Sequence, residues 1–303
     1  MQLYKKILCP VDFSEFSILA LRYAAALTKE NDALLLVYHS LPDLSQALGY
    51  LEPAAILTAK DAMQSNTESR LREFIGSIVS ERVRVRHQIG TESPSDAIPR
   101  IALEQNFDLI VMGTHGHTGY ERFFVGSTTN KVLHKSSVPV LTVCKPCHNF
   151  VEKDPNDSVH ISRIICALDL EPNNIGIAER ALAIARSYQS TIFFLHVAPE
   201  KEGLVDLDQE EKSVEIMKEL VGNAPEDWCT VRYLLRTGDP AREIMNALTD
   251  SNADLLVMGH HTRKPIEEVF LGSVAKKLVT DSPCPVLVVR TVQDAVTHDV
   301  VLI

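Results

Sequence analysis

The chain has 303 residues, of which 45% are hydrophobic, and a formal net charge of −10 at pH 7. This length accommodates about two ordinary domains. The acidic balance and the lack of a long basic run exclude sequence-independent binding of nucleic acid. No apolar stretch approaches the roughly 18 residues that span a bilayer, and the N-terminal sequence predicts a strand rather than an export signal. We therefore expect a cytoplasmic protein with reduced cysteines, bound to neither nucleic acid nor membrane.

The first half of the chain alternates between apolar runs and amphipathic segments. The runs KILCPV (6–11) and ALLLVYHS (33–40) are almost continuously apolar, which is typical of parallel strands covered on both faces. Between them, Ala20, Ala24 and Leu27 recur at helical spacing. A long helix follows, and another helix precedes the fourth strand. The remaining strands of this half are expected at 83–90, 107–113 and 138–143.

The second half repeats this order of elements. Asp169 matches Asp12 at an offset of 157 residues, and Asp254 matches Asp108 at an offset of 146. Residues 108–143 align with the second half without a gap, with 16 identities in 36 positions. Such internal similarity indicates a duplicated domain. The matching strands are expected at 163–168, 192–198, 230–238, 253–259 and 284–289.

The repeat predicts an α/β fold of two tandem, open, mostly parallel five-stranded sheets with helices on both faces. We expect domains at 1–145 and 161–303, joined by a polar linker at 146–160. The last strand of each half is apolar, and an exposed edge of that kind is prone to aggregation. The halves are therefore expected to pair through their last strands as a pseudo-dimer, and a homodimer of whole chains is a further expectation.

A similar loop follows the fourth strand of each half: MGTHGHTGYERFFVGST (112–128) and MGHHTRKPIEEVFLGSV (258–274). Ligands of open α/β sheets bind at the carboxyl ends of the strands. Glycines let the backbone approach a phosphate or adopt a positive φ, and a helix that starts at Gly126-Ser127-Thr128 offers N–H groups to an anion. The alternative is a structural strand-to-helix loop with Ser127 as the N-cap. Neither a Walker-type Gly-Lys-Ser/Thr nor a G-x-G-x-x-G motif is present.

The first loop resembles a known signature. Its spacing of Gly113-x-x-Gly116, nine residues and then Gly126-Ser127 is similar to the ATP-binding signature of the universal stress protein family. PVDFSE (10–15) and DLIVMGTHG (108–116) resemble that family as well. The resemblance covers nearly the whole chain as two tandem domains. It implies a Rossmann-like universal stress protein fold and a stress-response protein that binds ATP, rather than a dedicated metabolic enzyme.

The resemblance also assigns roles to residues of the first half by position. The residues expected to bind ATP are Pro10, Val11, Asp12, Ser40, Met112, Gly113, Gly116, Gly126, Ser127 and Thr128. The first three would line adenine and ribose, and the last three would hold the phosphates. Ser40 departs from the family, which often has Val packed on adenine there. Asp12 could also help to hold Mg²⁺, and its alternative role is an Asx-type cap at a strand-to-helix turn.

The second loop lacks one of these glycines. Thr262 stands where the first copy has Gly116, and a β-branched residue with positive φ would strain the loop by at least about 1–2 kcal/mol. Leu168 also replaces Val11 on the adenine side. We therefore predict one ATP per chain, in the first half, and a vestigial site or a site for another ligand in the second half. The residues of the vestigial site are Asp169, Val197, Gly259, Gly272 and Ser273.

Two further motifs leave alternatives open. CKPCH (144–148) matches the C-x-x-C-H of haem attachment and half of a zinc site, but we interpret it as a strand end and linker, with redox sensing as another alternative. The loop histidines could contact phosphate, ligate a metal or act as a base, or could simply be solvated. These histidines are His115, His117, His260 and His261.

No catalytic residue and no metal site is predicted, because no base that could position water is evident. A slow ATPase or phosphotransferase that uses the same pocket is the alternative from the class of enzymes. An interaction protein whose two sites are vestigial is the alternative from the class of structural modules.

Overall fold

The structure is a computed structural model. It describes residues 2–42, 53–114, 125–144, 150–151, 158–171, 174–200, 207–222, 229–260 and 272–290. Within these ranges the chain forms ten strands and eight helices.

The first half contains β1 (Lys6–Pro10), α1 (Glu15–Glu30), β2 (Leu34–Ser40), α3 (Pro53–Gly76), β3 (Val85–Gly90), α4 (Pro94–Glu104), β4 (Leu109–Gly113), α5 (Ser127–Lys135) and β5 (Val140–Val143). The second half contains β6 (Arg163–Ala167), α6 (Ile175–Tyr188), β7 (Thr191–Ala198), α7 (Leu207–Val221), β8 (Thr230–Thr237), α8 (Pro240–Ser251), β9 (Leu255–His260), α9 (Ser273–Asp281) and β10 (Val286–Arg290). The order of elements is therefore the same in both halves, as the internal repeat predicts.

All ten strands belong to one sheet, in the order β3-β2-β1-β4-β5-β10-β9-β6-β7-β8. The strands are parallel within each half, and β5 and β10 join the halves in antiparallel orientation, with Leu141 opposite Leu287. The predicted α/β class is confirmed. The sheet itself differs from the prediction of two five-stranded sheets, because the two apolar edge strands pair and form one continuous sheet.

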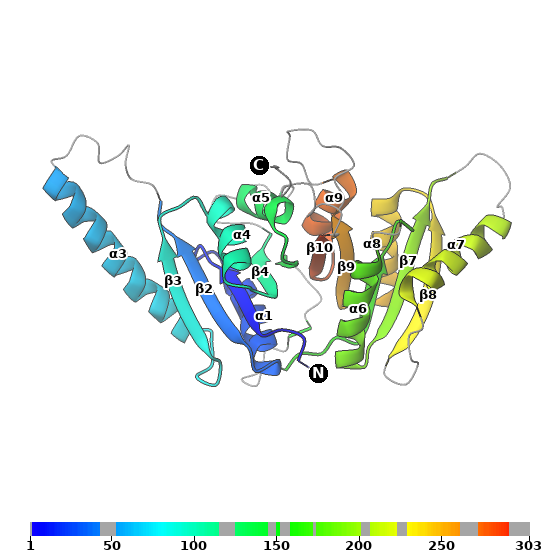
Figure 1. Cartoon of the computed structure of the whole chain (residues 1–303), viewed down its shortest axis with the longest axis horizontal. Helices are drawn as coiled ribbons and strands as arrows, with labels where there is room; N and C mark the ends of the chain where they lie inside the picture. Colours follow the sequence, from blue (N-terminus) through cyan, green and yellow to red (C-terminus); the bar gives the residue numbers. More distant parts are fainter. Residues whose placement is uncertain are drawn as a thin grey trace, which may run out of the picture.

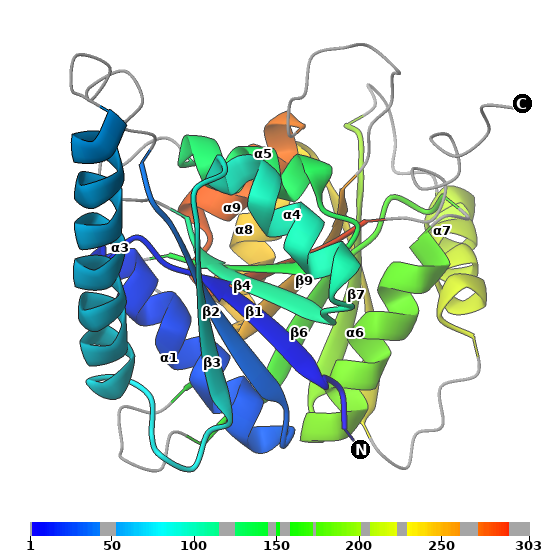
Figure 2. The ribbon, with the colours of Figure 1, turned by 60° about the vertical axis from the view of Figure 1, so that its left-hand side comes forward.

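Helices cover both faces of this sheet, and each face has its own hydrophobic core. Residues of α1, α3, α6 and α7 pack on one face, and residues of α4, α5, α8 and α9 pack on the other. Both cores extend across the junction: Leu141 and Leu287 belong to the first, whereas Val140 and Val286 belong to the second. Figure 1 shows α3 and α7 at the two outer ends of the molecule. Figure 2 shows α4 and α5 next to one another, near the middle of the sheet.

A carboxylate, half-buried in the first half and buried in the second, fixes the start of the first strand in each half. Asp108, just before β4, accepts hydrogen bonds from the backbone N–H groups of Lys5 (2.6 Å) and Lys6 (2.8 Å). Asp254 accepts two such bonds of 2.8 Å at the start of β6. A strand's first N–H groups have no partner in the neighbouring strand, and an unpaired buried donor costs about 1–3 kcal/mol. The two carboxylates therefore fix β1 against β4 and β6 against β9.

The segment between the halves contributes to the core. Phe150 is buried, and its ring packs edge-on against Tyr23 of α1 at a centroid distance of 4.6 Å. Val151 and Val159 form an antiparallel bridge, and both are buried. Part of the segment expected to be a polar linker is thus packed against the first domain's helix. Within the described residues, no helix is long and apolar enough to cross a membrane.

The seam between β5 and β10 generates a prediction about the separated halves. Fragments 1–145 and 161–303, expressed alone, would each expose an apolar edge strand, so we expect them to self-associate or aggregate in sedimentation velocity experiments. As a control, the full chain cut by a protease at a site inserted within 152–157 should sediment as one particle. Two monomeric fragments with native circular dichroism would contradict this expectation.

Candidate functional site

A pocket of about 220 Å³ opens at the carboxyl ends of β1, β2 and β4, beside the start of α5. The chain runs from β1 to β2 and β3 on one side, and then continues with β4 and β5 on the other side of β1. The pocket therefore lies at the point where the strand order reverses, which is where open α/β sheets bind their ligands. It is lined by Pro10, Val11, Asp12, Ser17, Tyr38, Ser40, Pro94, Ile98, Met112, Gly113, Gly126, Ser127, Thr128 and Thr129.

Nine of the ten residues expected at the first site line this pocket, and the tenth, Gly116, lies outside the described residues. Five lining residues were missed from the sequence: Ser17, Tyr38, Pro94, Ile98 and Thr129. One of these could have been found, because residues two apart on a strand face the same side, so that Ser40 implies Tyr38. Ser17, Pro94 and Ile98 lie in α1 and α4. Their place in the pocket depends on how those helices pack against the sheet, which a local sequence pattern does not predict.

Asp12 is held in place at the start of α1. One oxygen of its carboxylate accepts hydrogen bonds from the Ser17 hydroxyl (2.5 Å) and from the Ser14 N–H (3.1 Å), and its own N–H donates to the Ser17 hydroxyl (2.9 Å). The bond from Ser14 is an Asx turn, so Asp12 does have the capping geometry given above as its alternative role. It also lines the pocket, so the two roles are compatible.

The side of the pocket formed by β2 carries two hydroxyl groups. Ser40 donates its hydroxyl to the carbonyl of Glu92 at 2.5 Å. Burial raises the pKa of Tyr38, and the Ser40 hydroxyl partly offsets this shift. The Tyr38 hydroxyl occupies the space that a Cβ at position 90 would need, which explains why Gly90 is a glycine. The corresponding residues of the second half are Leu195 and Arg236, so both the hydroxyl and the glycine are absent there.

The opposite side of the pocket is the start of α5. Its N-cap is Gly126 rather than Ser127, with φ −53° and ψ 143°, and no side chain caps the helix. The first intrahelical bond runs from the Asn130 N–H to the Gly126 carbonyl (2.9 Å). The N–H groups of Ser127, Thr128 and Thr129 precede this bond, and the described part of the chain offers them no partner. Three donors and the positive end of the helix dipole therefore lie at the pocket.

Neither described glycine of this site, Gly113 or Gly126, has a positive φ, and Gly113 allows a close approach of backbone. In the described residues, the glycines with positive φ are Gly222 and Gly238, neither of which belongs to the pocket. At Gly113, a Cβ would lie 2.7 Å from Cβ of Phe16 and 3.1 Å from that residue's backbone. Gly113 thus permits α1 to pack against the end of β4. Asp12, just before α1, and Ser17, in its first turn, both line the pocket there.

Comparison with known proteins gives the family of the chain. The model of the universal stress protein family matches residues 3–143 and again residues 160–290. The chain belongs to the universal stress protein family. It is 23% identical over 297 residues to a universal stress protein of Mycolicibacterium smegmatis, covering 94% of this chain and 96% of that one.

Single-domain relatives and solved structures agree with this assignment. Universal stress protein MJ0531 of Methanocaldococcus jannaschii is 31% identical over 144 residues, covering 48% of this chain and 84% of that protein. The crystal structure of a universal stress protein from Archaeoglobus fulgidus DSM 4304 matches with a TM-score of 0.72 and 22% identity, covering 97% and 98% of the two chains. The tandem arrangement is therefore found in other members of the family.

The second half of this universal stress protein keeps the backbone elements of the site and Ser273, but loses most of the other hydroxyl groups. Asp169 follows β6, Val197 lies in β7, Gly259 lies in β9, and Gly272 and Ser273 start α9. Val274 and Ala275 stand where the first half has Thr128 and Thr129. Asp169 accepts hydrogen bonds from the side chain of Asn174 and from the N–H of Glu171. The residues expected at the vestigial site thus occupy matching positions with fewer polar groups around them.

The remaining motifs lie partly outside the described residues. Cys144 directly follows β5, is buried, and donates its thiol to the Ser282 carbonyl (3.2 Å). Cys147 and His148 are not described. The described residues contain no group of three potential metal ligands. Of the loop histidines, His260 is described. It is 3% exposed and packs edge-on against His134 at 5.3 Å, so the expectation of a solvated side chain is wrong for it.

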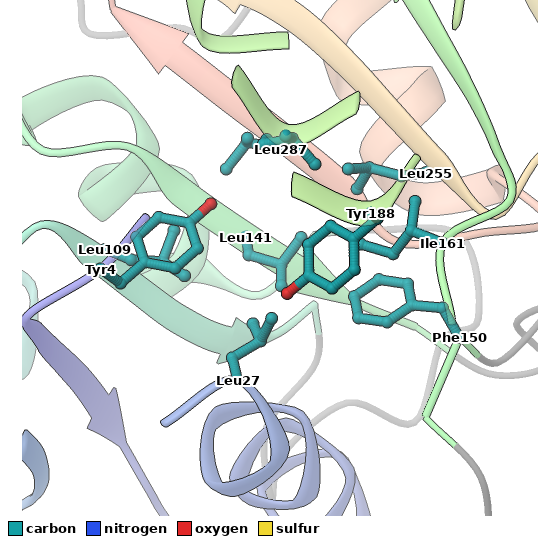
Figure 3. A pocket seen from close by; sticks show the side chains of 10 residues that line it. Tyr4, Leu27, Leu109, Leu141, Phe150, Ile161, Tyr188, Leu255 and Leu287 are labelled. Carbon is teal, nitrogen blue, oxygen red and sulfur yellow. The ribbon is translucent and has the colours of Figure 1, made fainter. Parts of the chain in front are cut away.

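A second, much smaller cavity lies between the two halves (Figure 3). Its volume is about 20 Å³, enough for one water molecule but not for a nucleotide. Tyr4 and Tyr188 face it from the two halves, together with Leu141, Phe150 and Leu287. Burial raises the pKa of Tyr4 to about 12 and raises that of Tyr188 further. This cavity belongs to the packing of the seam and is not a ligand site.

The contact between Gly113 and α1 predicts a stability change. Gly113→Ala should lower the free energy of unfolding by about 1–3 kcal/mol, because its Cβ would force Phe16 and the backbone of α1 to move. Gly76→Ala is the matched control, since a Cβ there meets nothing within 4 Å, and it should be neutral or stabilising by about 0.5–1 kcal/mol. Urea unfolding followed by circular dichroism measures both. Equal stabilities of Gly113→Ala and the wild type would contradict this prediction and show that α1 can move away from β4 without a loss of stability.

Proposed function

We propose that this universal stress protein binds ATP in its first half and acts as a regulatory protein of the stress response. The observation that carries the proposal is the pocket at the β1–β4 switch point, which joins an apolar wall to an uncapped helix start. Its volume of about 220 Å³ is a little below the roughly 300–1,000 Å³ usual for ligand sites. Residues 115–124, which connect β4 to α5, are not among the described residues.

The apolar wall fits a nucleobase. Val11, Ile98 and Met112 are buried residues that line the pocket from the end of β1, from α4 and from β4. A flat purine gains from such surfaces because its faces leave water on binding. Tyr38, Ser40 and Asp12 add polar atoms to the lining, and we place the ribose beside Asp12.

The start of α5 fits the phosphates. Its first N–H groups have no partner within the described part of the chain, and together with the helix dipole they favour an anion without the need for a lysine or arginine. The hydroxyls of Ser127 and Thr128 line the same end of the pocket and can donate as well. Gly126 leaves the approach to these donors open. The proposal includes Mg²⁺ as the ion that accompanies ATP. Asp12, the one carboxylate among the described lining residues, would be its ligand from the protein.

Binding is favoured over catalysis by the same lining. Asp12 is the one carboxylate among the described lining residues, and one of its oxygens already accepts two hydrogen bonds. No histidine or second acid in that lining could orient an attacking water. A slow ATPase or phosphotransferase is the alternative. Multiple-turnover assays separate the two: retention of one equivalent of ATP without release of ADP supports binding.

We propose further that the chain comprises universal stress protein domains at 1–145 and 161–303, which act as a pseudo-dimer in the cytoplasm. The pairing of β5 with β10 and the two hydrophobic cores that continue across it support the proposed pseudo-dimer. The loss of Thr128 and Thr129 equivalents in the second half supports a single ATP per chain, in the first half. The second site would be empty or hold another ligand.

Titration calorimetry tests this proposal. The wild type should bind ATP with a stoichiometry near one. Gly126→Val should weaken binding more than tenfold, or about 1.4 kcal/mol, because its side chain covers the N–H donors. Ser127→Ala should cost about 0.5–1.5 kcal/mol. The φ and ψ of Gly126 suit valine, so this variant should fold.

Gly272→Val, the same change in the second half, is the matched control and should leave ATP affinity unchanged. A stoichiometry near two with similar affinities, or an unaltered isotherm for Gly126→Val, would contradict the proposal. Mass spectrometry of the denatured protein for a co-purified nucleotide gives an independent check.

A further inference from the structure

His39 contacts Val11, a residue that lines the pocket. Its Nδ1 lies 2.8 Å from the carbonyl oxygen of Val11. A carbonyl only accepts hydrogen bonds, so Nδ1 must carry the proton and donate it. Tyr38 and Ser40, the neighbours of His39 in β2, line the pocket. Because side chains alternate along a strand, His39 points to the other face of the sheet and does not contact a ligand in the pocket.

The same imidazole also packs against the residue that follows Asp12. Phe13 has a φ of 65°, in the left-handed region that large side chains rarely adopt. Its ring lies 4.6 Å from the ring of His39 and 5.3 Å from the ring of Phe74, and the guanidinium of Arg70 lies 4.2 Å above it. A strained backbone persists where its surroundings over-determine it, and such sites cluster where function requires a fixed geometry.

His39 therefore contacts the chain at two places: the carbonyl group of Val11, and the ring of Phe13, the residue after Asp12. The hydrogen bond fixes the carbonyl of Val11, and the ring contact fixes the side chain of Phe13. Both Val11 and Asp12 line the pocket, one on the apolar wall and the other beside the start of α5. We propose that His39 is a positioning residue for the nucleotide site, which sets the place of Val11 and Asp12 without touching the ligand. This inference rests on the function proposed above.

The second half contains the same histidine hydrogen bond and the same left-handed residue at the matching positions. Nδ1 of His196 lies 2.9 Å from the carbonyl oxygen of Leu168, and Leu170 has a φ of 64°. The hydrogen bond and the left-handed residue are thus also present in the half that has lost most of the hydroxyls of the pocket. His196 consequently offers a control within the same molecule: it makes the same bond in the half that is not proposed to bind ATP.

The test compares three variants by titration with ATP and by urea unfolding. His39→Ala removes the donor and should weaken ATP binding about three- to tenfold, the effect of one lost hydrogen bond. His39→Asn keeps an N–H donor near the position of Nδ1 and should recover most of that loss. His196→Ala should leave ATP affinity unchanged, although it lowers stability by an amount similar to His39→Ala.

A second measurement does not depend on the ligand. The backbone amide signals of Asp12 and Ser14 in ¹H–¹⁵N spectra should shift in His39→Ala and return toward their wild-type positions in His39→Asn. Wild-type ATP affinity in His39→Ala, equal weakening by His196→Ala, or unmoved amide signals would overturn the positioning role. If the wild type itself fails to bind ATP, the proposed function fails, and the amide signals still decide whether His39 sets the geometry of Asp12.

Discussion

Three residue pairs, from Val140 opposite Val288 to Thr142 opposite Val286, join β5 to β10 and determine how the rest of the molecule is arranged. They turn two open sheets into one and let both hydrophobic cores continue from one half into the other. Because the pairing is antiparallel, the carboxyl ends of the strands point in opposite directions in the two halves. The starts of α5 and α9, which follow the carboxyl ends of β4 and β9, therefore lie at opposite ends of the strands.

Within each half, the site depends on backbone geometry more than on reactive side chains. A carboxylate fixes the start of the first strand, an imidazole fixes its end, and a glycine allows α1 to approach β4. These contacts bring Asp12, the apolar wall and the N–H groups of α5 into one pocket. A site of this kind suits selective retention of a ligand, because it presents fixed donors and surfaces but little acid–base chemistry.

Much of this could be predicted from the sequence because the apolar runs, the duplication and the strand-end position of Asp12 are local signals. The resemblance to the universal stress protein family, carried by the loop spacing and by the end of the first strand, assigned nine of the residues that line the pocket. The contributions of Ser17 and Ile98 depend on how α1 and α4 pack, and no sequence period encodes that. The left-handed Phe13 and the burial of His260 were missed for the same reason, since each results from contacts between distant segments.

The covalent link between the halves has a consequence for evolution and for assembly. In a dimer of identical subunits, every mutation appears in both sites, and the subunits separate and exchange on dilution. In this chain the seam between β5 and β10 is intramolecular, so its two edges remain at a high effective concentration whatever the amount of protein in the cell. Each half is also free to mutate alone. Val274 and Ala275 could replace hydroxyl residues in one half while Thr128 and Thr129 stayed in the other.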